Sequence, residues 1–402
     1  MSKVFIVAAK RTATGAMMGS LKNIPASDFG AEVVKQLIAD TKIDPKNLDE
    51  VIVGNILPAG AGQGIGRQVA IKAGVPQEVP GYAISMACGS AMKALMTSFT
   101  SIKAGLHNLV IAGGTESMTR APYLVSADVR TGVKMGDMKM VDHMILDALT
   151  DAYTGVHMGI TAENIATKFN ITREEQDQFA YQSQLKAIKA VDAGEFDDEI
   201  VPLTIKERKG EFVFARDEYP NRTTNLEKLG GLRAAFKKDG SVTAGNASGI
   251  NDGASFLLVA SEEAVKKYNL TPLVEVIGIG QGGVDPQLMG LGPVPAVANA
   301  LKHAGLKLQD IDVIELNEAF AAQSIGVVKS LAAEHGVAEE DIYKMTNIKG
   351  GAIALGHPVG ASGARITVTL IHLMKKHGFT HGLASLCIGG GMGTAVILKN
   401  VK

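Results

Sequence analysis

The sequence of 402 residues predicts an α/β fold made of two similar halves with an inserted loop region. Three observations predict it: apolar strand-like segments alternate with helical ones, the two ends repeat one order of elements, and the middle differs in composition. Alternation of this kind is typical of sheets with parallel strands. A chain of this length suits two or three packed units better than one core.

Short apolar segments predict the strands, and longer segments rich in alanine and leucine predict the helices. The expected strands cover residues 4–9, 50–53, 109–112, 273–277, 313–316, 383–387 and 395–398. The expected helices cover residues 31–39, 92–104, 296–304, 324–333 and 364–377.

The front and rear parts of the chain echo each other, which indicates an internal duplication. Residues 48–55 and residues 310–317 each follow a predicted helix and have similar sequences. Small-residue loops around Cys88 and Gly360 each precede a helix and then a strand that runs into glycines. We therefore expect two halves packed face to face, with a site where their loops meet. The expected divisions are 1–118 (completed by about 245–270), 119–244 and 271–402.

The expected loop region is rich in methionine and in polar residues. A polar helix is predicted to begin at Thr172, which has the capping-box spacing to Glu175, and to end near Gly194. A hairpin with Lys209-Gly210 as its turn follows. We expect the methionines to fill irregular packing gaps: Met118, Met135, Met138, Met140, Met144 and Met158.

The composition excludes several classes of protein. Lys plus Arg total 40 and Asp plus Glu total 41, so no basic excess favours a nucleic-acid partner. Two cysteines do not make a disulfide framework and favour a reducing compartment, so we expect a cytoplasmic protein. The uncharged stretch 383–398 is glycine-rich and short for a membrane span, and 4–9 is short for a signal-peptide core.

Cys88 lies among small residues just before a predicted helix. Amides at a helix N-terminus stabilise a thiolate, which is the reactive form of cysteine, so this position fits a nucleophile. A buried, inert cysteine is the alternative, and this segment alone leaves the two interpretations about even.

Three further polar positions lie at strand ends or helix starts of the rear half. They are Asn317, His357 between Gly356 and Pro358, and Cys387 before three glycines. A histidine in a glycine-rich loop fits an acid–base role. Singly, each has a plain structural alternative: a turn asparagine, a hydrogen-bonded loop histidine and a core cysteine.

The segments Cys88-Gly89-Ser90, 317–320 (NEAF), 356–358 (GHP) and 387–391 (CIGGG) occur in the order typical of one family. Together they resemble the thiolase family, in particular its short-chain biosynthetic type, and the resemblance runs over residues 4–398. It implies a five-layer αβαβα fold and reversible Claisen condensation of two acetyl-CoA to acetoacetyl-CoA and CoA. It implies no metal or redox cofactor, and a homotetramer.

The resemblance also implies roles for the four residues. Cys88 is expected to be the acylated nucleophile and His357 its base, while Cys387 moves the α-proton of the second acetyl-CoA. Asn317, through a water, and His357 are expected to stabilise the enolate. The amides of Cys88 and Gly389 are expected to hold the oxyanion.

Further positions are expected from the resemblance to contact coenzyme A or the acyl group. Those of the pantetheine tunnel and its surroundings are Ser248, Ala247, His157, Leu149, Phe236, Ala319 and Phe320. Met158 and Met289 are expected to shorten the acyl pocket, and Arg222 to meet the adenine end. Two positions depart from the family pattern: Ser85 replaces the usual Asn, and Ala91 replaces a glycine.

Two other functions stay open from the sequence. One is a carrier-like or lipid-binding member of the family with little catalysis, against which the four matching positions argue. The other is a nicotinamide-dependent oxidoreductase, because residues 60–66 (GAGQGIG) have the glycine spacing of short-chain dehydrogenases. Pro58 and the late position of this loop favour a flexible loop instead. If Cys88 and Cys387 share one site, oxidation is also expected to link them.

Overall fold

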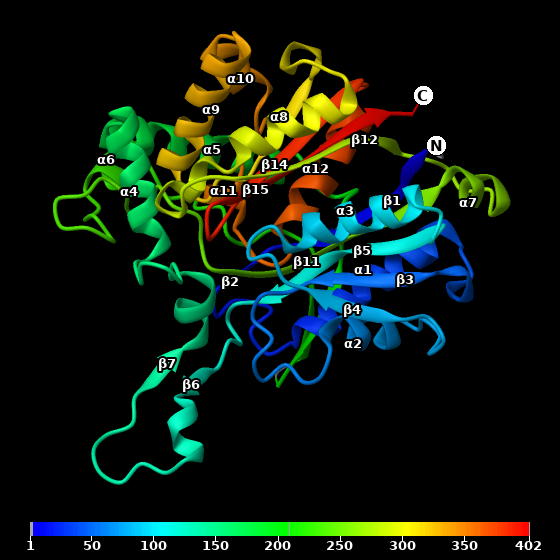
Figure 1. The fold of residues 1–402 in the computed structure, drawn as a ribbon, viewed down its shortest axis with the longest axis horizontal. Coiled ribbons are helices and arrows are strands. Elements are labelled where there is room, and N and C mark those ends of the chain that lie inside the picture. Colours follow the sequence, from blue (N-terminus) through cyan, green and yellow to red (C-terminus); the bar gives the residue numbers. More distant parts are fainter. Residues whose placement is uncertain (1–2, 209, 402) are drawn as a thin grey trace.

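A computed structural model describes residues 3–208 and 210–401 of the chain. Two halves of the molecule share one large sheet (Figure 1). The N-terminal half is blue to cyan except for β11, which is yellow-green, and the C-terminal half is yellow to red. The main elements of the N-terminal half are β1 (Val4–Thr12), α1 (Ala26–Thr41), β3 (Glu50–Gly54), α2 (Ile65–Lys72), β4 (Gly81–Ile84), α3 (Ser90–Lys103), β5 (Leu109–Ser117) and β11 (Asn251–Ser261). Those of the C-terminal half are β12 (Val274–Gly283), α8 (Pro293–Ala304), β13 (Val313–Leu316), α9 (Ala321–His335), α10 (Glu339–Met345), α11 (Ala352–Leu355), α12 (Ser362–His377), β14 (His381–Ile388) and β15 (Met392–Asn400).

The strand order supports the predicted duplication. The N-terminal strands are arranged β3–β5–β11–β1, with β4 outside β3, and the C-terminal strands are arranged β13–β14–β15–β12. The pairs β3–β5 and β13–β14 are parallel, and the pairs β5–β11 and β14–β15 are antiparallel. The two arrays join where β1 pairs with β12, at Phe5 with Glu275 and Ile6 with Val274.

The expectation of parallel strands is therefore only partly right, because the sheet is mixed. The sequence prediction missed β11, which lies between β1 and β5. Its first residues are polar although the whole strand is buried. Asp252, for example, accepts hydrogen bonds from Ser117 and the Thr119 amide. Polar groups satisfied by distant partners hide the start of β11 from a hydrophobicity pattern, whereas its residues 256–260 (FLLVA) form an apolar run like those of the predicted strands.

Three hydrophobic clusters define five layers. One cluster packs α1 and α2 on the outer face of the N-terminal strands. A second places α3 and α12 between the N-terminal and C-terminal strands. A third packs α8 and α9 on the outer face of the C-terminal strands. This αβαβα arrangement confirms the predicted fold class; the expected domain limits themselves stay a prediction.

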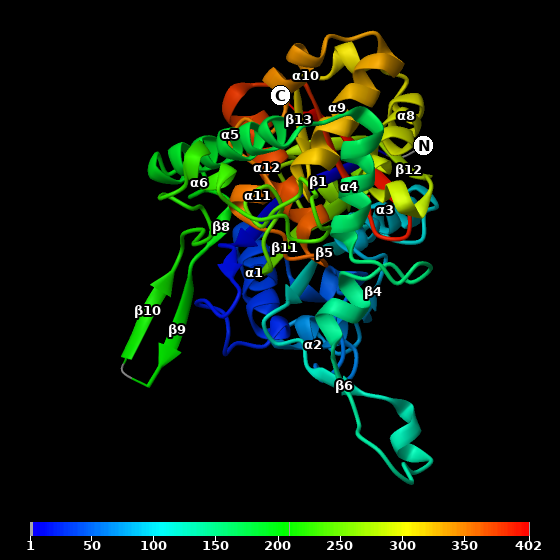
Figure 2. The same ribbon diagram turned by 90° about the vertical axis from the view of Figure 1, so that its left-hand side faces the viewer.

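The loop region contains α4 (Met158–Phe169), α5 (Arg173–Asp192) and two hairpins. Thr172 and Glu175 form the predicted capping box, and α5 ends just before Gly194. The second hairpin joins β9 (Leu203–Glu207) to β10 (Gly210–Phe214), and of its predicted turn Lys209 lies outside the described residues. Figure 2 shows both hairpins extending away from the body. None of the described helices is long and apolar enough to cross a membrane.

The first hairpin, which we call the arm, covers residues 119–143 and includes β6 (Tyr123–Val125) and β7 (Met140–Asp142). Met118, Met144 and Met158 are buried, but Met135, Met138 and Met140 of the arm are 93%, 58% and 67% exposed. The prediction that these methionines fill packing gaps is wrong for the three in the arm, because the arm extends beyond the core.

Candidate active site

A tight loop presents Cys88 at the start of α3. Ala87 has a φ of 42°, which is unusual for a residue with a side chain. The Ser90 hydroxyl braces the loop, accepting from the Met86 amide at 2.8 Å and donating to the Ala87 carbonyl at 2.7 Å. A Cβ on Gly89 would lie 2.3 Å from Cδ1 of Ile388, so only glycine lets the loop approach β14 this closely.

The electrostatics of Cys88 differ from the expectation for a helix N-terminus. Burial raises the pKa of Cys88 to about 11, although a hydrogen bond from the Gly389 amide acts in the opposite direction. Burial therefore has the larger effect on the pKa. The free-energy cost of removing a thiolate from water exceeds the stabilisation that the backbone amides provide. The thiol of the unliganded protein needs a base to become a nucleophile at neutral pH.

His357 lies in the loop between α11 and α12 and is held from two sides. Its Nδ1 is 2.6 Å from Oγ of Ser362, and its amide donates to Oδ1 of Asn251 at 2.9 Å. Its Nε2 is 3.5 Å from Nδ2 of Asn317. Burial, assisted by the charge of Arg365, lowers the pKa of His357 to about 3. The imidazole is therefore neutral at physiological pH, so one of its ring nitrogens has a free lone pair.

Asn317 and Cys387 come from neighbouring strands. Asn317 directly follows β13, and its amide donates to the Ser385 carbonyl of β14 at 3.0 Å. Cys387 is 2% exposed near the end of β14. Burial, followed by the nearby Cys88, raises the pKa of Cys387 well above its usual range. Both cysteines are free thiols.

The loops of the two halves meet through glycines. A Cβ on Gly114 would lie 2.2 Å from the Gly360 carbonyl oxygen, and one on Gly54 would lie 2.7 Å from the same oxygen. Val359, two residues after His357, packs in one cluster with Cys88. The structure thus brings Cys88, His357, Asn317, Cys387 and Gly389 to one region, while their catalytic roles stay a prediction.

Sequence reasoning missed the residues that support this region. Glu116 is fully buried at the end of β5 and accepts hydrogen bonds from the amides of Ile56 and Gly360 at 2.8 and 3.1 Å. Burial raises the pKa of Glu116 to about 7, against the effect of these amides. Ser362 and Asn251, which hold His357, were also missed. Only Ser362 had a local signal, since it lies at the start of a predicted helix.

The predicted acyl-pocket residues form a cluster beside Cys387. Met158 and Met289, predicted for the acyl pocket, belong to this cluster, which we call the acyl-pocket cluster. So do Ala247, Ala319 and Phe320, predicted to contact coenzyme A or the substrate, and Phe236 packs against them. A Cβ on Gly389 would lie 3.6 Å from the Met158 sulfur, so this methionine borders the sulfur sites.

The remaining predicted contacts surround that cluster. His157 stacks on Phe236 at a centroid distance of 4.5 Å. The Ser248 amide donates to the Ala319 carbonyl at 2.9 Å. This hydrogen bond joins residues 246–249 to the loop that follows β13. Leu149 packs with the cluster that includes Cys88.

Arg222 lies farther out, where it pairs with Asp192 at 2.6 Å. It also lines a cavity of about 670 Å³ together with Tyr219, Ala244 and Gly245. Of the two departures from the family pattern, Ser85 is exposed and Ala91 is buried. The methyl group of Ala91 faces Gly114 and therefore packs against the junction of the halves.

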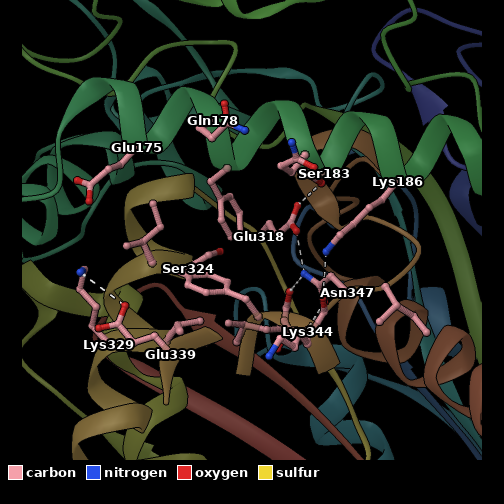
Figure 3. Close-up of a pocket in the computed structure, with 18 residues that line it drawn as sticks. Glu175, Gln178, Ser183, Lys186, Glu318, Ser324, Lys329, Glu339, Lys344 and Asn347 are labelled. Carbon is pink, nitrogen blue, oxygen red and sulfur yellow. Dashed lines mark hydrogen bonds and ion pairs between the residues drawn. The ribbon is translucent and has the colours of Figure 1, made fainter. Parts of the chain in front are cut away.

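Another cavity, of about 690 Å³, lies between α5, α9 and α10 (Figure 3). Glu318, next to Asn317 in the chain, lies at its floor and accepts from Ser183 at 2.6 Å and from Asn347 at 2.8 Å. Lys329 pairs with Glu339 at its rim. These polar groups satisfy one another, so this cavity offers no reactive group comparable with those beside Cys88.

Of residues 60–66, the first five form the predicted irregular loop and the last two begin α2. Three of the four glycines have positive φ, at Gly60, Gly62 and Gly64. Their conformation explains why glycine occurs there without requiring a bound nucleotide.

Comparisons with known proteins identify the family. The model of the thiolase N-terminal domain matches residues 4–263, and that of the thiolase C-terminal domain matches residues 270–400. A probable acetyl-CoA acyltransferase of Staphylococcus aureus (strain COL) is 49% identical over 403 residues, covering 100% of both chains.

Two solved structures are also similar over the whole chain. Acetyl-CoA acetyltransferase from Syntrophomonas wolfei has a TM-score of 0.96 and 42% identity, with 100% of both chains covered. Human mitochondrial 3-ketoacyl-CoA thiolase in complex with CoA has a TM-score of 0.93 and 43% identity, covering 100% of this chain and 98% of that one. The chain belongs to the thiolase family of acyltransferases.

Proposed function

We propose that this protein is an acetyl-CoA C-acetyltransferase that reversibly condenses two acetyl-CoA to acetoacetyl-CoA and CoA. The observation that carries this is the convergence of two thiols, Cys88 and Cys387, with the neutral imidazole of His357 and the amide of Gly389. Acyl capture and α-proton transfer are separate steps, and two sulfurs allow one group for each.

In the first step, Nε2 of His357 takes the thiol proton of Cys88, whose sulfur attacks the acetyl carbonyl. The amides of Cys88 and Gly389 hold the oxyanion; losing one such donor typically costs about 2.7–4 kcal/mol. The bond to the CoA sulfur then breaks, and that sulfur leaves with the proton from His357.

In the second step, Cys387 gives its proton to His357 and removes the α-proton of a second acetyl-CoA. His357 and Asn317, the latter through a water, stabilise the enolate oxygen. The enolate carbon attacks acetyl-Cys88, a C–C bond forms, and the Cys88 sulfur leaves and takes the proton held by His357. Thiolysis is the reverse sequence.

The acyl-length proposal depends on Met158 and Met289. Both are buried and pack with Cys387, so they fill space that a longer acyl chain would need. One of the similar structures is named as a 3-ketoacyl-CoA thiolase, which makes cleavage of longer 3-ketoacyl-CoA the second candidate function. We propose that coenzyme A reaches the sulfurs past His157, Phe236, Ala247 and Ser248, with Arg222 toward its adenine end.

We further propose that the chain works in the cytoplasm as a homotetramer without metal or redox cofactor. The arm carries exposed apolar side chains on a hairpin that extends from the body, among them Tyr123, Met135 and Met140. Contact with the same arm of a second copy of the chain would bury these side chains. Sedimentation of the native chain and of an arm-deleted chain tests this proposal, and an unchanged mass would contradict it.

The decisive experiment is the cleavage of acetoacetyl-CoA with added CoA. The loss of the absorbance of the acetoacetyl-CoA enolate measures its rate. We expect activity in the native protein and none above background in Cys88→Ala, and a large loss in Cys387→Ala. Full activity of Cys88→Ala would refute the nucleophile. CoA binding without turnover would instead support a carrier, and saturable NAD(P)H binding would support an oxidoreductase. A profile across 3-ketoacyl-CoA lengths separates the two thiolase functions.

A further inference from the structure

The imidazole of His357 is held by a hydroxyl that has a second partner. Oγ of Ser362 lies 2.6 Å from Nδ1 of His357 and 2.9 Å from the carbonyl oxygen of Pro358. Ser362 is fully buried at the first position of α12, and His357 is 5% exposed. Bulk water therefore does not compete for these bonds.

Counting the hydrogens separates two arrangements. A serine hydroxyl has one hydrogen, a carbonyl oxygen only accepts, and a neutral imidazole carries one N–H. If Ser362 donates to Pro358, its oxygen accepts from Nδ1–H and Nε2 has a free lone pair. If Ser362 donates to Nδ1, the proton of the ring is on Nε2, and His357 has no basic nitrogen facing the site.

The other side of the ring favours the first arrangement. The amide nitrogen of Asn317, which can only donate, lies 3.5 Å from Nε2. An unprotonated Nε2 accepts from this donor, whereas a protonated Nε2 would oppose one N–H with another. The hydroxyl of Ser362, which donates to the Pro358 carbonyl at 2.9 Å, carries the assignment of the proton to Nδ1. The side-chain amide of Asn317 agrees with it in the orientation that the structure has, in which its Oδ1 has no partner.

We propose that Ser362 is a positioning residue that fixes the neutral tautomer of His357 with Nδ1 protonated and Nε2 free to act as base. The inference rests on the proposed function, in which Nε2 takes the thiol proton of Cys88. When Nε2 receives that proton, the Nδ1–H group stays hydrogen-bonded to Oγ of Ser362. The lone pair of Oγ then stabilises the positive charge of the imidazolium. No other proton has to move.

The first test is spectroscopic and needs only the native protein. In protein labelled with ¹⁵N-histidine, the resonances of His357 are those that vanish in His357→Asn. We expect Nε2 to give the signal of an unprotonated nitrogen and Nδ1 that of an N–H. A protonated Nε2 in the native protein overturns the proposal, whether or not the protein has thiolase activity.

The second test is Ser362→Ala, with Ser98→Ala as its matched control. Ser98 is also fully buried in a helix and donates to the carbonyl four residues earlier, Ala94, at 2.9 Å, but it has no contact with His357. Loss of a hydrogen bond to a charged group predicts a fall in kcat of about 10- to 100-fold in Ser362→Ala. The KM for CoA is expected to stay unchanged, and the ¹⁵N spectrum to show a mixture of tautomers.

The outcomes distinguish the two proposals. A native protein without thiolase activity contradicts the proposed function, while the ¹⁵N spectra still decide the role of Ser362. Native-like kcat and an unchanged tautomer in Ser362→Ala, with an active native enzyme, contradict the role of Ser362 alone. Equal losses in Ser98→Ala and Ser362→Ala would identify a general packing effect and also contradict it.

Discussion

The backbone amide of Gly389 donates a hydrogen bond to the sulfur of Cys88, so that the two halves of the molecule meet at the proposed nucleophile. Gly389 directly follows β14 of the C-terminal half, and Cys88 lies two residues before the first residue of α3 in the N-terminal half. The same amide is well placed for an oxyanion, because an acyl group on the sulfur would lie beside it.

This environment predicts how Cys88 reacts with an alkylating reagent. Burial raises the pKa of Cys88 to about 11, so the thiolate fraction at neutral pH is smaller than in a free cysteine. We expect the alkylation rate with iodoacetamide to keep rising with pH up to about 11 rather than level off near 8.5, the usual value. Peptide mass spectrometry against pH measures the rate, with glutathione as reference. A plateau below pH 8 would contradict the burial argument.

A second prediction concerns the contact between Gly114 and the His357 loop. A Cβ at Gly114 would lie 2.2 Å from the carbonyl oxygen of Gly360, which is backbone and cannot swing away. Gly114→Ala should displace this loop and lower both activity and the apparent unfolding temperature, with overpacking costing about 1–3 kcal/mol.

Gly230→Ala is the control for that change. Nothing lies within 4 Å of a Cβ at Gly230, and its backbone is compatible with alanine. Its activity and unfolding temperature should equal those of the native protein. Equal behaviour of the two variants would show that the halves do not depend on this close approach.

The sequence predicts the outline of the fold well because regular elements leave a local pattern. The strand after residue 48 and the one after residue 310 were found from apolar runs, and Thr172 with Glu175 from a spacing alone. β11 was missed although residues 256–260 (FLLVA) have such a pattern; only the polar start of the strand, which is satisfied across the sheet, lacks one. Mixed strand directions were missed for a similar reason, since direction is a property of the topology.

The candidate site was predictable only in part. Its reactive residues lie in short motifs, which resemblance to a family can identify. The residues that position these reactive groups do not lie in such motifs. Glu116 and Asn251 act through hydrogen bonds to loops that are far away in the chain. The stabilisation of a thiolate expected from the helix start does not set the pKa of Cys88, which burial raises. Long-range contacts set the electrostatics that the local sequence cannot specify.

A third prediction concerns the proposed path of coenzyme A. Phe236 stacks on His157 at 4.5 Å and meets Phe320 edge-on at 6.1 Å, so it joins both sides of the acyl-pocket cluster. Phe236→Ala should raise the KM for CoA by about tenfold, since an aromatic pair contributes about 0.5–1.5 kcal/mol beyond its buried area. The control is Phe212→Ala on the exposed hairpin, where we expect no change. Equal KM values in steady-state thiolysis would place the tunnel elsewhere.

The last prediction concerns a buried ion network that ties β1 to the loop region. The guanidinium of Arg11, which is 1% exposed, donates to Glu199 at 2.6 Å and to both oxygens of Asp217 at 2.7 and 2.9 Å. Burial alone would lower the pKa of Arg11, but Asp217 and then Glu199 raise it, so the charge is retained. Asp217→Ala leaves that buried charge half-paired, which typically costs about 3–5 kcal/mol.

We therefore expect Asp217→Ala to unfold at a markedly lower urea concentration than the native protein, with the midpoint followed by circular dichroism. Asp192→Ala is the matched control, because it removes an ion pair with Arg222 in which both side chains are 52% exposed. Solvent screens that pair, so its midpoint should not change measurably. Equal midpoints for both variants would mean that water or another side chain compensates Arg11. A loss confined to Asp217→Ala would show that the Arg11 network stabilises the attachment of the loop region to β1.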